Sequence, residues 1–180
     1  MPGRLVAVVG PSGAGKDTLI AAAQAARPGL HVARRVITRP EEAGGEPFEG
    51  VTPAEFARRK AQGDFALDWE AHGLCYGIPA SIDAALAQGR DVVFNGSRAM
   101  LGSAWEHYPG LSVIHVTASA PVLAERLAAR GRETRQDIAR RLARASYEIP
   151  YGIPIRVVQN DGPLAQAVAA FLAALQPDRG

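Results

Sequence analysis

Short apolar runs alternate along the chain with longer segments of helical character. Residues 5–9, Leu-Val-Ala-Val-Val, form a continuous apolar run, which is typical of a strand buried on both faces of a parallel sheet. Strands are predicted at 5–9, 31–37, 65–69, 74–76, 91–95, 111–117 and 155–158, and helices at 16–26, 53–63, 79–88, 98–107, 120–130, 133–146 and 163–175. This alternation predicts an α/β fold in which a parallel sheet carries helices on both faces.

Composition narrows the class of protein further. The chain has 180 residues, which predicts a single domain over 1–180, since a domain averages roughly 150 residues. Its one cysteine, Cys75, excludes an internal disulfide and fits a reducing compartment. A net charge of +2 does not argue for a nucleic-acid partner. No apolar run approaches the roughly 20 residues that cross a bilayer. We therefore expect a cytoplasmic chain that binds neither nucleic acid nor a membrane.

A glycine-rich loop lies between the first predicted strand and the first predicted helix. It consists of Gly10, Pro11, Ser12, Gly13, Ala14, Gly15 and Lys16. In this context successive backbone N–H groups form an anion nest, which the helix N-terminus reinforces. Lys16 supplies a mobile ammonium group for the β- and γ-phosphates of a nucleotide. The pattern therefore predicts a phosphate-binding loop, and the alternative is an ordinary glycine-rich turn.

An acidic residue follows the lysine of this loop. The usual pattern has Ser or Thr there, whose hydroxyl ligates Mg²⁺, whereas this chain has Asp17 and then Thr18. A carboxylate is also a hard oxygen ligand for Mg²⁺. We predict that Asp17, Thr18 or both hold the metal. The alternative is that Asp17 is a solvated acid that interacts with the helix dipole.

Arginines mark the carboxyl ends of two predicted strands, where ligands of such sheets bind. Arg39 follows the predicted strand 31–37, and Arg98 follows the predicted strand 91–95. Arg34 and Arg35 alternate along a strand and therefore point to opposite faces, so we favour Arg35 as the one that faces the site. The alternative for each of them is a solvated surface arginine.

Several motifs together resemble guanylate kinases over nearly the whole chain. They are the glycine-rich loop, residues 36–39 (Val-Ile-Thr-Arg), 74–77 (Leu-Cys-Tyr-Gly), the arginine-rich stretch 126–142 and 159–161 (Gln-Asn-Asp). The resemblance implies a P-loop nucleoside-monophosphate-kinase-like core at 1–37 and 79–180. It also implies an acceptor-binding insertion at about 38–78 and a lid at about 131–137.

The chain departs from guanylate kinases where those enzymes recognise guanine. Leu67 stands in place of a glutamate, Ile78 in place of a Ser or Thr, and Asn95-Gly96-Ser97 in place of Asp-x-Asp. A pocket without polar partners for a base edge loses the strong discrimination that such partners provide. Gly-Lys-Asp in the loop, 35–39 and 95–98 (Asn-Gly-Ser-Arg) instead resemble ribose 1,5-bisphosphate phosphokinases. Phe48 and Glu70 stand where that family's pattern has histidine.

This second resemblance implies a reaction and a set of site residues. The reaction is ATP- and Mg²⁺-dependent phosphorylation of ribose 1,5-bisphosphate to 5-phospho-α-D-ribose 1-diphosphate. The resemblance implies catalytic roles for Lys16, Arg132 and Arg141, nucleotide contacts from Arg130 and Asn160, and acceptor contacts from Arg35, Arg39, Tyr76, Asn95, Ser97 and Arg98. Tyr76 either donates its hydroxyl to a phosphate or packs, and Asn95 either contacts metal-bound water or caps its strand.

The acceptor in this reaction is a phosphate oxygen, which is already largely anionic and needs no general base. Catalysis then consists of positioning and of cationic screening of the reactants. Alternatives are a guanylate kinase with a relaxed pocket, a guanylate-kinase-like binding module without catalysis, and a nucleotide switch. The presence of Lys16 disfavours the binding module, and no Asn-Lys-x-Asp run supports a GTP switch. The partners implied are small molecules, and the oligomeric state, a homodimer included, stays open.

Overall fold

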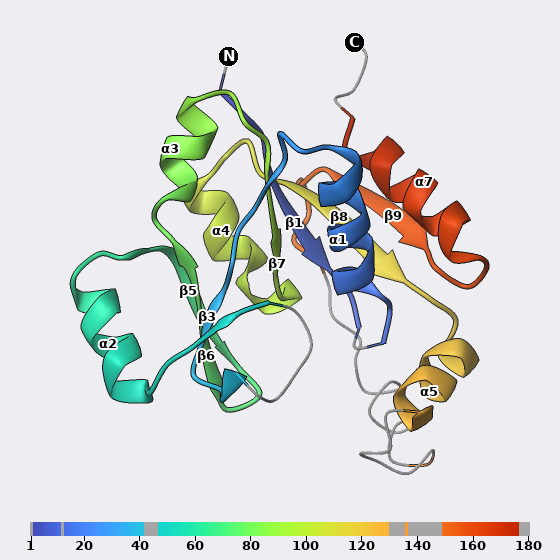
Figure 1. Cartoon of the computed structure of the whole chain (residues 1–180), viewed down its shortest axis with the longest axis horizontal. Coiled ribbons are helices and arrows are strands. Elements are labelled where there is room, and N and C mark those ends of the chain that lie inside the picture. The colour runs from blue at the N-terminus through green and yellow to red at the C-terminus, as the bar shows by residue number, and fades with distance from the viewer. Residues whose placement is uncertain (1, 12, 42–46, 130–135, 137–148, 177–180) are drawn as a thin grey trace.

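The computed structural model of the chain describes residues 2–11, 13–41, 47–129, 136 and 149–176. Five parallel strands form the main sheet in the order β2-β7-β1-β8-β9. Their bounds are β1 Leu5–Val9, β2 His31–Val32, β7 Val92–Asn95, β8 Ser112–Thr117 and β9 Ile155–Gln159. β1 occupies the centre of the sheet, so the loop that follows it emerges between the ends of β7 and β8 (Figure 1).

Helices cover both faces of this sheet, as the sequence predicts. Helix α1 (Lys16–Ala26), α5 (Ala120–Ala129) and α7 (Leu164–Ala174) share one buried cluster with Val6 and Val8 of β1. Helix α3 (Ile82–Ala87) and α4 (Leu101–His107), which follows a short 3-10 turn at Arg98–Met100, share the other cluster with Leu5, Ala7 and Val9. All five residues of β1 are buried. The α/β fold predicted from the apolar runs is thereby confirmed.

A second sheet of four strands lies beside the first (Figure 1). Its order is β4-β3-β6-β5, with β3 Val36–Ile37, β4 Glu49–Gly50, β5 Phe65–Ala71 and β6 Leu74–Pro79. β5 and β6 form an antiparallel hairpin. Helix α2 (Pro53–Ala61) begins as the sequence predicts, because the Thr52 hydroxyl accepts a hydrogen bond from the Glu55 amide and Pro53 occupies the first turn.

The single strand predicted at 31–37 is wrong. Residues 31–32 pair with β7 in the main sheet, whereas 36–37 pair with β4 and β6 in the second sheet. The arginine pair at 34 and 35 interrupts the apolar run. After this pair, residues 36–37 have a hydrogen-bonded strand on each side, β4 and β6, in the second sheet. Residues 49–50, for which no strand is predicted, form β4, and the helix predicted from Pro79 begins at Ile82 because Pro79 pairs with Phe65.

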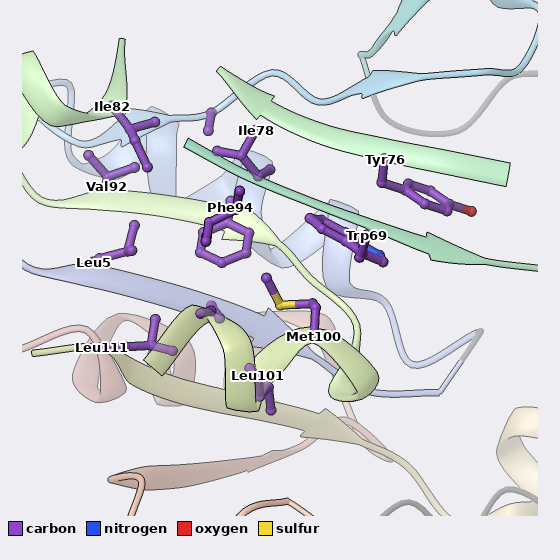
Figure 2. Packing of buried hydrophobic residues seen from close by; sticks show 14 of the residues in the cluster. Leu5, Trp69, Tyr76, Ile78, Ile82, Val92, Phe94, Met100, Leu101 and Leu111 are labelled. Atoms are coloured by element: carbon purple, nitrogen blue, oxygen red, sulfur yellow. The ribbon is translucent and has the colours of Figure 1, made fainter. Parts of the chain in front are cut away.

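One hydrophobic cluster joins the two sheets. Ile78, Trp69 and Tyr76 of the hairpin belong to the same buried cluster as Phe94 and Met100 of the core, and Figure 2 labels these side chains. The second sheet is therefore packed against the edge of the core at which the glycine-rich loop and the end of β7 lie. No helix in the described part of the chain is long and apolar enough to cross a membrane.

Candidate nucleotide and acceptor site

The glycine-rich loop adopts the conformation of a phosphate-binding loop. Gly10, Gly13 and Gly15 have φ angles of 153°, 86° and 92°, values that side-chain-bearing residues rarely adopt. The Lys16 ammonium bends back over the loop and donates to the Gly10 carbonyl at 2.7 Å. The loop leads directly into α1, so the unpaired N–H groups of that helix begin where the loop ends. Ser12 lies outside the described residues.

Two side chains hold the outer carbonyls of this loop. Asn160, at the end of β9, is buried and donates from Nδ2 to the Ala14 carbonyl at 2.8 Å. Arg126, on α5, donates from Nη1 to the Gly13 carbonyl at 3.1 Å and from Nη2 to the Asn160 carbonyl at 2.6 Å. Asn160 was among the predicted nucleotide contacts, and its side chain lies under the loop. Sequence reasoning did not select Arg126 as a site residue, although it opens the arginine-rich stretch that carried the resemblance.

The carboxylate of Asp17 faces the end of the neighbouring strand. Its Oδ1 accepts a hydrogen bond of 2.7 Å from the amide nitrogen of Asn95, which is buried at the end of β7. Asn95 therefore contacts the residue predicted to hold the metal. No such side-chain contact is recorded for Thr18 within the described ranges. Ser97, two residues later, caps the turn that follows, because its hydroxyl accepts from the Ala99 amide at 3.4 Å.

Arg34 and Arg35 lie between β2 and β3, outside any strand, and they have different surroundings. Arg34 donates to the Phe48 carbonyl at 3.1 Å. Burial lowers the pKa of Arg35 to about 10, the charges of Tyr76 and Asp17 oppose that shift, and the charge of Arg39 adds to it. With a pKa near 10, Arg35 remains a cation at neutral pH. Its charge therefore lies close enough to Asp17 and Arg39 to interact with both.

Aromatic rings contact the guanidinium groups of Arg35 and Arg39. The guanidinium carbon of Arg35 lies 4.9 Å from the centroid of the Tyr76 ring, and that of Arg39 lies 4.3 Å from the centroid of the Phe48 ring. Tyr76 is itself stacked on Trp69, with ring centroids 5.4 Å apart and planes 7° from parallel, and Figure 2 shows the two rings side by side. These rings restrict the guanidinium groups and add cation–π attraction. The Tyr76 ring packs against Trp69 and Arg35, and the Phe48 ring lies beneath Arg39.

Leu67 and Ile78 belong to the hydrophobic core. They are 6% and 0% exposed and are partners across the β5–β6 hairpin. The two positions at which guanylate kinases carry base-reading polar groups therefore hold packed aliphatic side chains in this chain.

His115 lies on β8 opposite Val9 and interacts electrostatically with Arg98, the other arginine predicted at the carboxyl edge of the sheet. Burial lowers the pKa of this imidazole, and the charges of Arg98 and Lys16 lower it further. Arg98 and the loop lysine therefore share one electrostatic environment at the ends of β1, β7 and β8. The sequence analysis did not select His115, since a lone histidine in an apolar strand carries no motif.

Three predicted arginines lie outside the described residues. They are Arg130, Arg132 and Arg141, and the predicted lid at about 131–137 lies outside as well, apart from residue 136. Among the described residues, no group of three or more His, Cys, Asp or Glu side chains forms a metal cage.

The chain is similar in sequence to curated ribose 1,5-bisphosphate kinases. It is 49% identical over 182 residues to ribose 1,5-bisphosphate phosphokinase PhnN of Pseudomonas fluorescens, which covers 97% of this chain and 96% of the relative. It is 50% identical over 170 residues to a bifunctional ribose 1,5-bisphosphokinase-thymidine phosphorylase of Cupriavidus necator, which covers 94% of this chain and 28% of that longer relative. No protein-family model matches the chain.

Solved structures with a similar fold include a guanylate kinase and a gluconokinase. Guanylate kinase from Anaplasma phagocytophilum superposes with a TM-score of 0.71 at 16% identity, covering 97% of this chain and 85% of that chain. A gluconokinase from Sinorhizobium meliloti superposes with a TM-score of 0.54 at 24% identity, covering 97% of this chain and 91% of that chain. At these identities the likeness concerns the fold alone.

Proposed function

The chain belongs to the ribose 1,5-bisphosphate phosphokinase family, and we propose that it transfers the γ-phosphate of ATP to the 1-phosphate of ribose 1,5-bisphosphate. The product of this transfer is 5-phospho-α-D-ribose 1-diphosphate. The proposal is supported by a contrast within the proposed acceptor site, between its two arginines and the two apolar residues at the base-reading positions. Arg35 and Arg39 are held there on aromatic rings, whereas the base-reading positions are occupied by the buried Leu67 and Ile78.

The charge of the acceptor explains why the cations matter. A pentose bisphosphate carries up to about −4 at neutral pH, since each phosphate monoester carries roughly −1.5 to −2. It must approach a γ-phosphate that is also negative, so the barrier is dominated by repulsion and by alignment. Arg35 is half-buried beside Tyr76, and a charge in such surroundings is screened less than one at the surface. It is therefore well suited to bind one phosphate of the acceptor.

The residues at the nucleotide end have complementary roles in this proposal. The loop binds the polyphosphate through its backbone N–H groups, and Lys16 moves from the Gly10 carbonyl to the β- and γ-phosphates. Arg132 and Arg141 stabilise the equatorial γ-oxygens in the transition state, and Arg130 binds the polyphosphate. The segment at about 131–137 excludes water, which otherwise competes as an acceptor. No side chain is required as a general base, because the attacking phosphate oxygen is already anionic.

The donor set near the loop fits a magnesium ion. The Asp17 carboxylate supplies hard oxygen ligands, and its Oδ1 accepts a 2.7 Å hydrogen bond from the side-chain Nδ2 of Asn95 on the neighbouring strand. Mg²⁺ is usually held by one or two carboxylates together with substrate phosphates rather than by a cage of protein ligands. When bound, Mg²⁺ neutralises charge on the β- and γ-phosphates. We assign the metal contact to Asp17, with Asn95 orienting its carboxylate.

The acceptor is tested by comparing two substrates in an ADP-release assay. We expect turnover with ribose 1,5-bisphosphate and a kcat/KM at least about 100-fold lower with GMP, because the site lacks polar partners for the guanine edge. Phosphorus NMR of the product should show a new diphosphate on C1. Ribose 5-phosphate, which lacks the accepting phosphate, is the matched control and should release no ADP. Turnover with GMP alone would overturn the proposal.

Replacing Asp17 with asparagine tests the metal assignment. The Asp17→Asn side chain keeps one oxygen that can accept from Asn95, loses the negative charge and replaces the second carboxylate oxygen by an NH2 group, which does not ligate a metal. We expect the Mg²⁺ concentration for half-maximal activity to rise about 10- to 100-fold, the range seen when groups around a metal site are altered. The measurement is turnover against Mg²⁺ at saturating ATP. Asp83→Asn on α3, where the carboxylate accepts from Tyr108, is the control. An unchanged Mg²⁺ dependence in Asp17→Asn would rule out Asp17 as the ligand.

A further inference from the structure

The outer side of the phosphate loop is tied to two elements distant in sequence. Arg126 donates to the carbonyls of Gly13 and Asn160 at 3.1 Å and 2.6 Å, and the Asn160 amide donates to the Ala14 carbonyl at 2.8 Å. Consecutive carbonyls of the loop are thus each held by a side chain. The Arg126 guanidinium group connects the two contacts. It donates to the Gly13 carbonyl of the loop and also to the backbone carbonyl of Asn160, whose side chain holds the Ala14 carbonyl.

The supports of this arrangement are themselves fixed. The Asn160 backbone amide donates to the Thr117 carbonyl at 2.7 Å. The neighbouring Asp161 carboxylate accepts from the Ser119 amide at 2.6 Å, so the ends of β8 and β9 are joined on both sides of the asparagine. Helix α5 also packs against the loop, since a Cβ added to Gly13 would lie only 3.3 Å from the Leu127 side chain. Arg126 therefore extends from a helix that already rests on the loop.

Holding a carbonyl determines where the N–H of the same peptide points, because the peptide unit is planar and trans. The carbonyl of Gly13 and the N–H of Ala14 belong to one peptide, and that N–H donates to the Pro11 carbonyl at 3.2 Å, which closes the loop. The carbonyl of Ala14 and the N–H of Gly15 belong to the next peptide. With this carbonyl held on the outside by Asn160, the Gly15 N–H is directed to the opposite side, where the anion binds.

We propose that Arg126 is a positioning residue of the phosphate loop, which sets the orientation of these two peptides before the nucleotide binds. It acts through the Gly13 carbonyl directly and through Asn160 on the Ala14 carbonyl. Preorganised donors bind a polyanion more tightly because the protein does not have to reorganise on binding. The inference rests on the loop binding nucleotide polyphosphate and not on the identity of the acceptor.

The test measures ADP binding to the full-length chain by calorimetry, without acceptor, for Arg126→Met and Arg126→Lys. A hydrogen bond to a charged group contributes about 10- to 100-fold in an equilibrium constant, so we expect Arg126→Met to weaken ADP binding by about that factor. Lysine keeps the charge but has no planar fork to hold both carbonyls, so it should recover only part of the loss. In steady state we expect the KM for ATP to rise while the KM for the acceptor stays unchanged.

Arg156 provides a matched control. Its guanidinium also binds backbone carbonyls, those of Ala173, Ala174 and Gln176 at the end of α7, at 3.3, 3.1 and 2.9 Å. Arg156→Met should lower the melting temperature without changing ADP affinity. Native ADP affinity in Arg126→Lys would overturn the proposal, and this variant decides the matter if Arg126→Met does not fold. Equal losses of affinity in the Arg126 and Arg156 variants would also overturn it, since both would then reflect general destabilisation. Failure of the acceptor assay alone would leave this result unaffected.

Discussion

Replacing Lys16 with methionine is expected to lower kcat for phosphoryl transfer by at least about 10²- to 10³-fold, the loss typical of removing one preorganised group that stabilises transition-state charge. Methionine preserves most of the length and packing of the side chain and removes the ammonium. In the folded protein this ammonium donates a hydrogen bond to the Gly10 carbonyl, and methionine retains the aliphatic packing, so we expect the melting temperature to change little. The measurement is single-turnover transfer from radiolabelled ATP at saturating acceptor.

Lys60 is the natural control, because it is the other lysine of the sequence. It lies on α2, with its ammonium 2.9 Å from an Asp68 carboxylate oxygen and its side chain 61% exposed. Exposed ion pairs contribute about 0–1 kcal/mol to stability, and this pair has no contact with the loop. Lys60→Met should therefore turn over within about twofold of the native protein. If Lys16→Met retained full turnover, the loop would not be catalytic and a nucleotide-binding module would become the better interpretation.

The parts of the molecule that the sequence predicted correctly depend on local rules. The run at 5–9 is apolar at every position, as is typical of a strand that is buried on both faces of a parallel sheet. In the structure every residue of β1 is buried. The start of α2 follows from Thr52, Pro53 and Glu55, three neighbours whose mutual contacts the helix geometry dictates. Gly10, Gly13 and Gly15 of the phosphate loop have positive φ angles, which glycine adopts more readily than any other residue. In each case the information lies within a few residues of the structure that it determines.

The parts that the sequence did not predict depend on partners far away in the chain. Whether residues 31–37 continue as one strand is decided by β4, β6 and β7, and not by their own pattern. The contact of Arg126 with the loop spans 113 positions, and the acceptor in that bond is a backbone carbonyl that no residue type specifies. Phe48 and Tyr76 became recognisable as supports for Arg39 and Arg35 only once the second sheet had brought them together.

Gly10→Ala is expected to have the largest effect on stability, because the added carbon has no space and its neighbour cannot move. A Cβ at this position would lie 2.0 Å from the Val116 carbonyl oxygen, and that oxygen belongs to a central strand of the main sheet. The φ angle of 153° is also rarely adopted by L-residues. Relief would require β1 and β8 to separate beside their Val9–His115 pair. We expect a loss of more than about 4 kcal/mol in the free energy of unfolding, a size that marks severe steric or packing faults.

The same substitution should also abolish nucleotide binding, because the clash with the Val116 carbonyl displaces the residue at which the phosphate loop begins. Urea denaturation with linear extrapolation measures the stability, and Gly29→Ala is the matched control. A Cβ at Gly29 meets no atom within 4 Å, and this glycine does not have a positive φ. Gly29→Ala should therefore change stability by no more than about 1 kcal/mol, and in the stabilising direction if its backbone angles suit alanine. If Gly10→Ala were as stable as Gly29→Ala, the close approach of β1 and β8 that directs the phosphate loop would be contradicted.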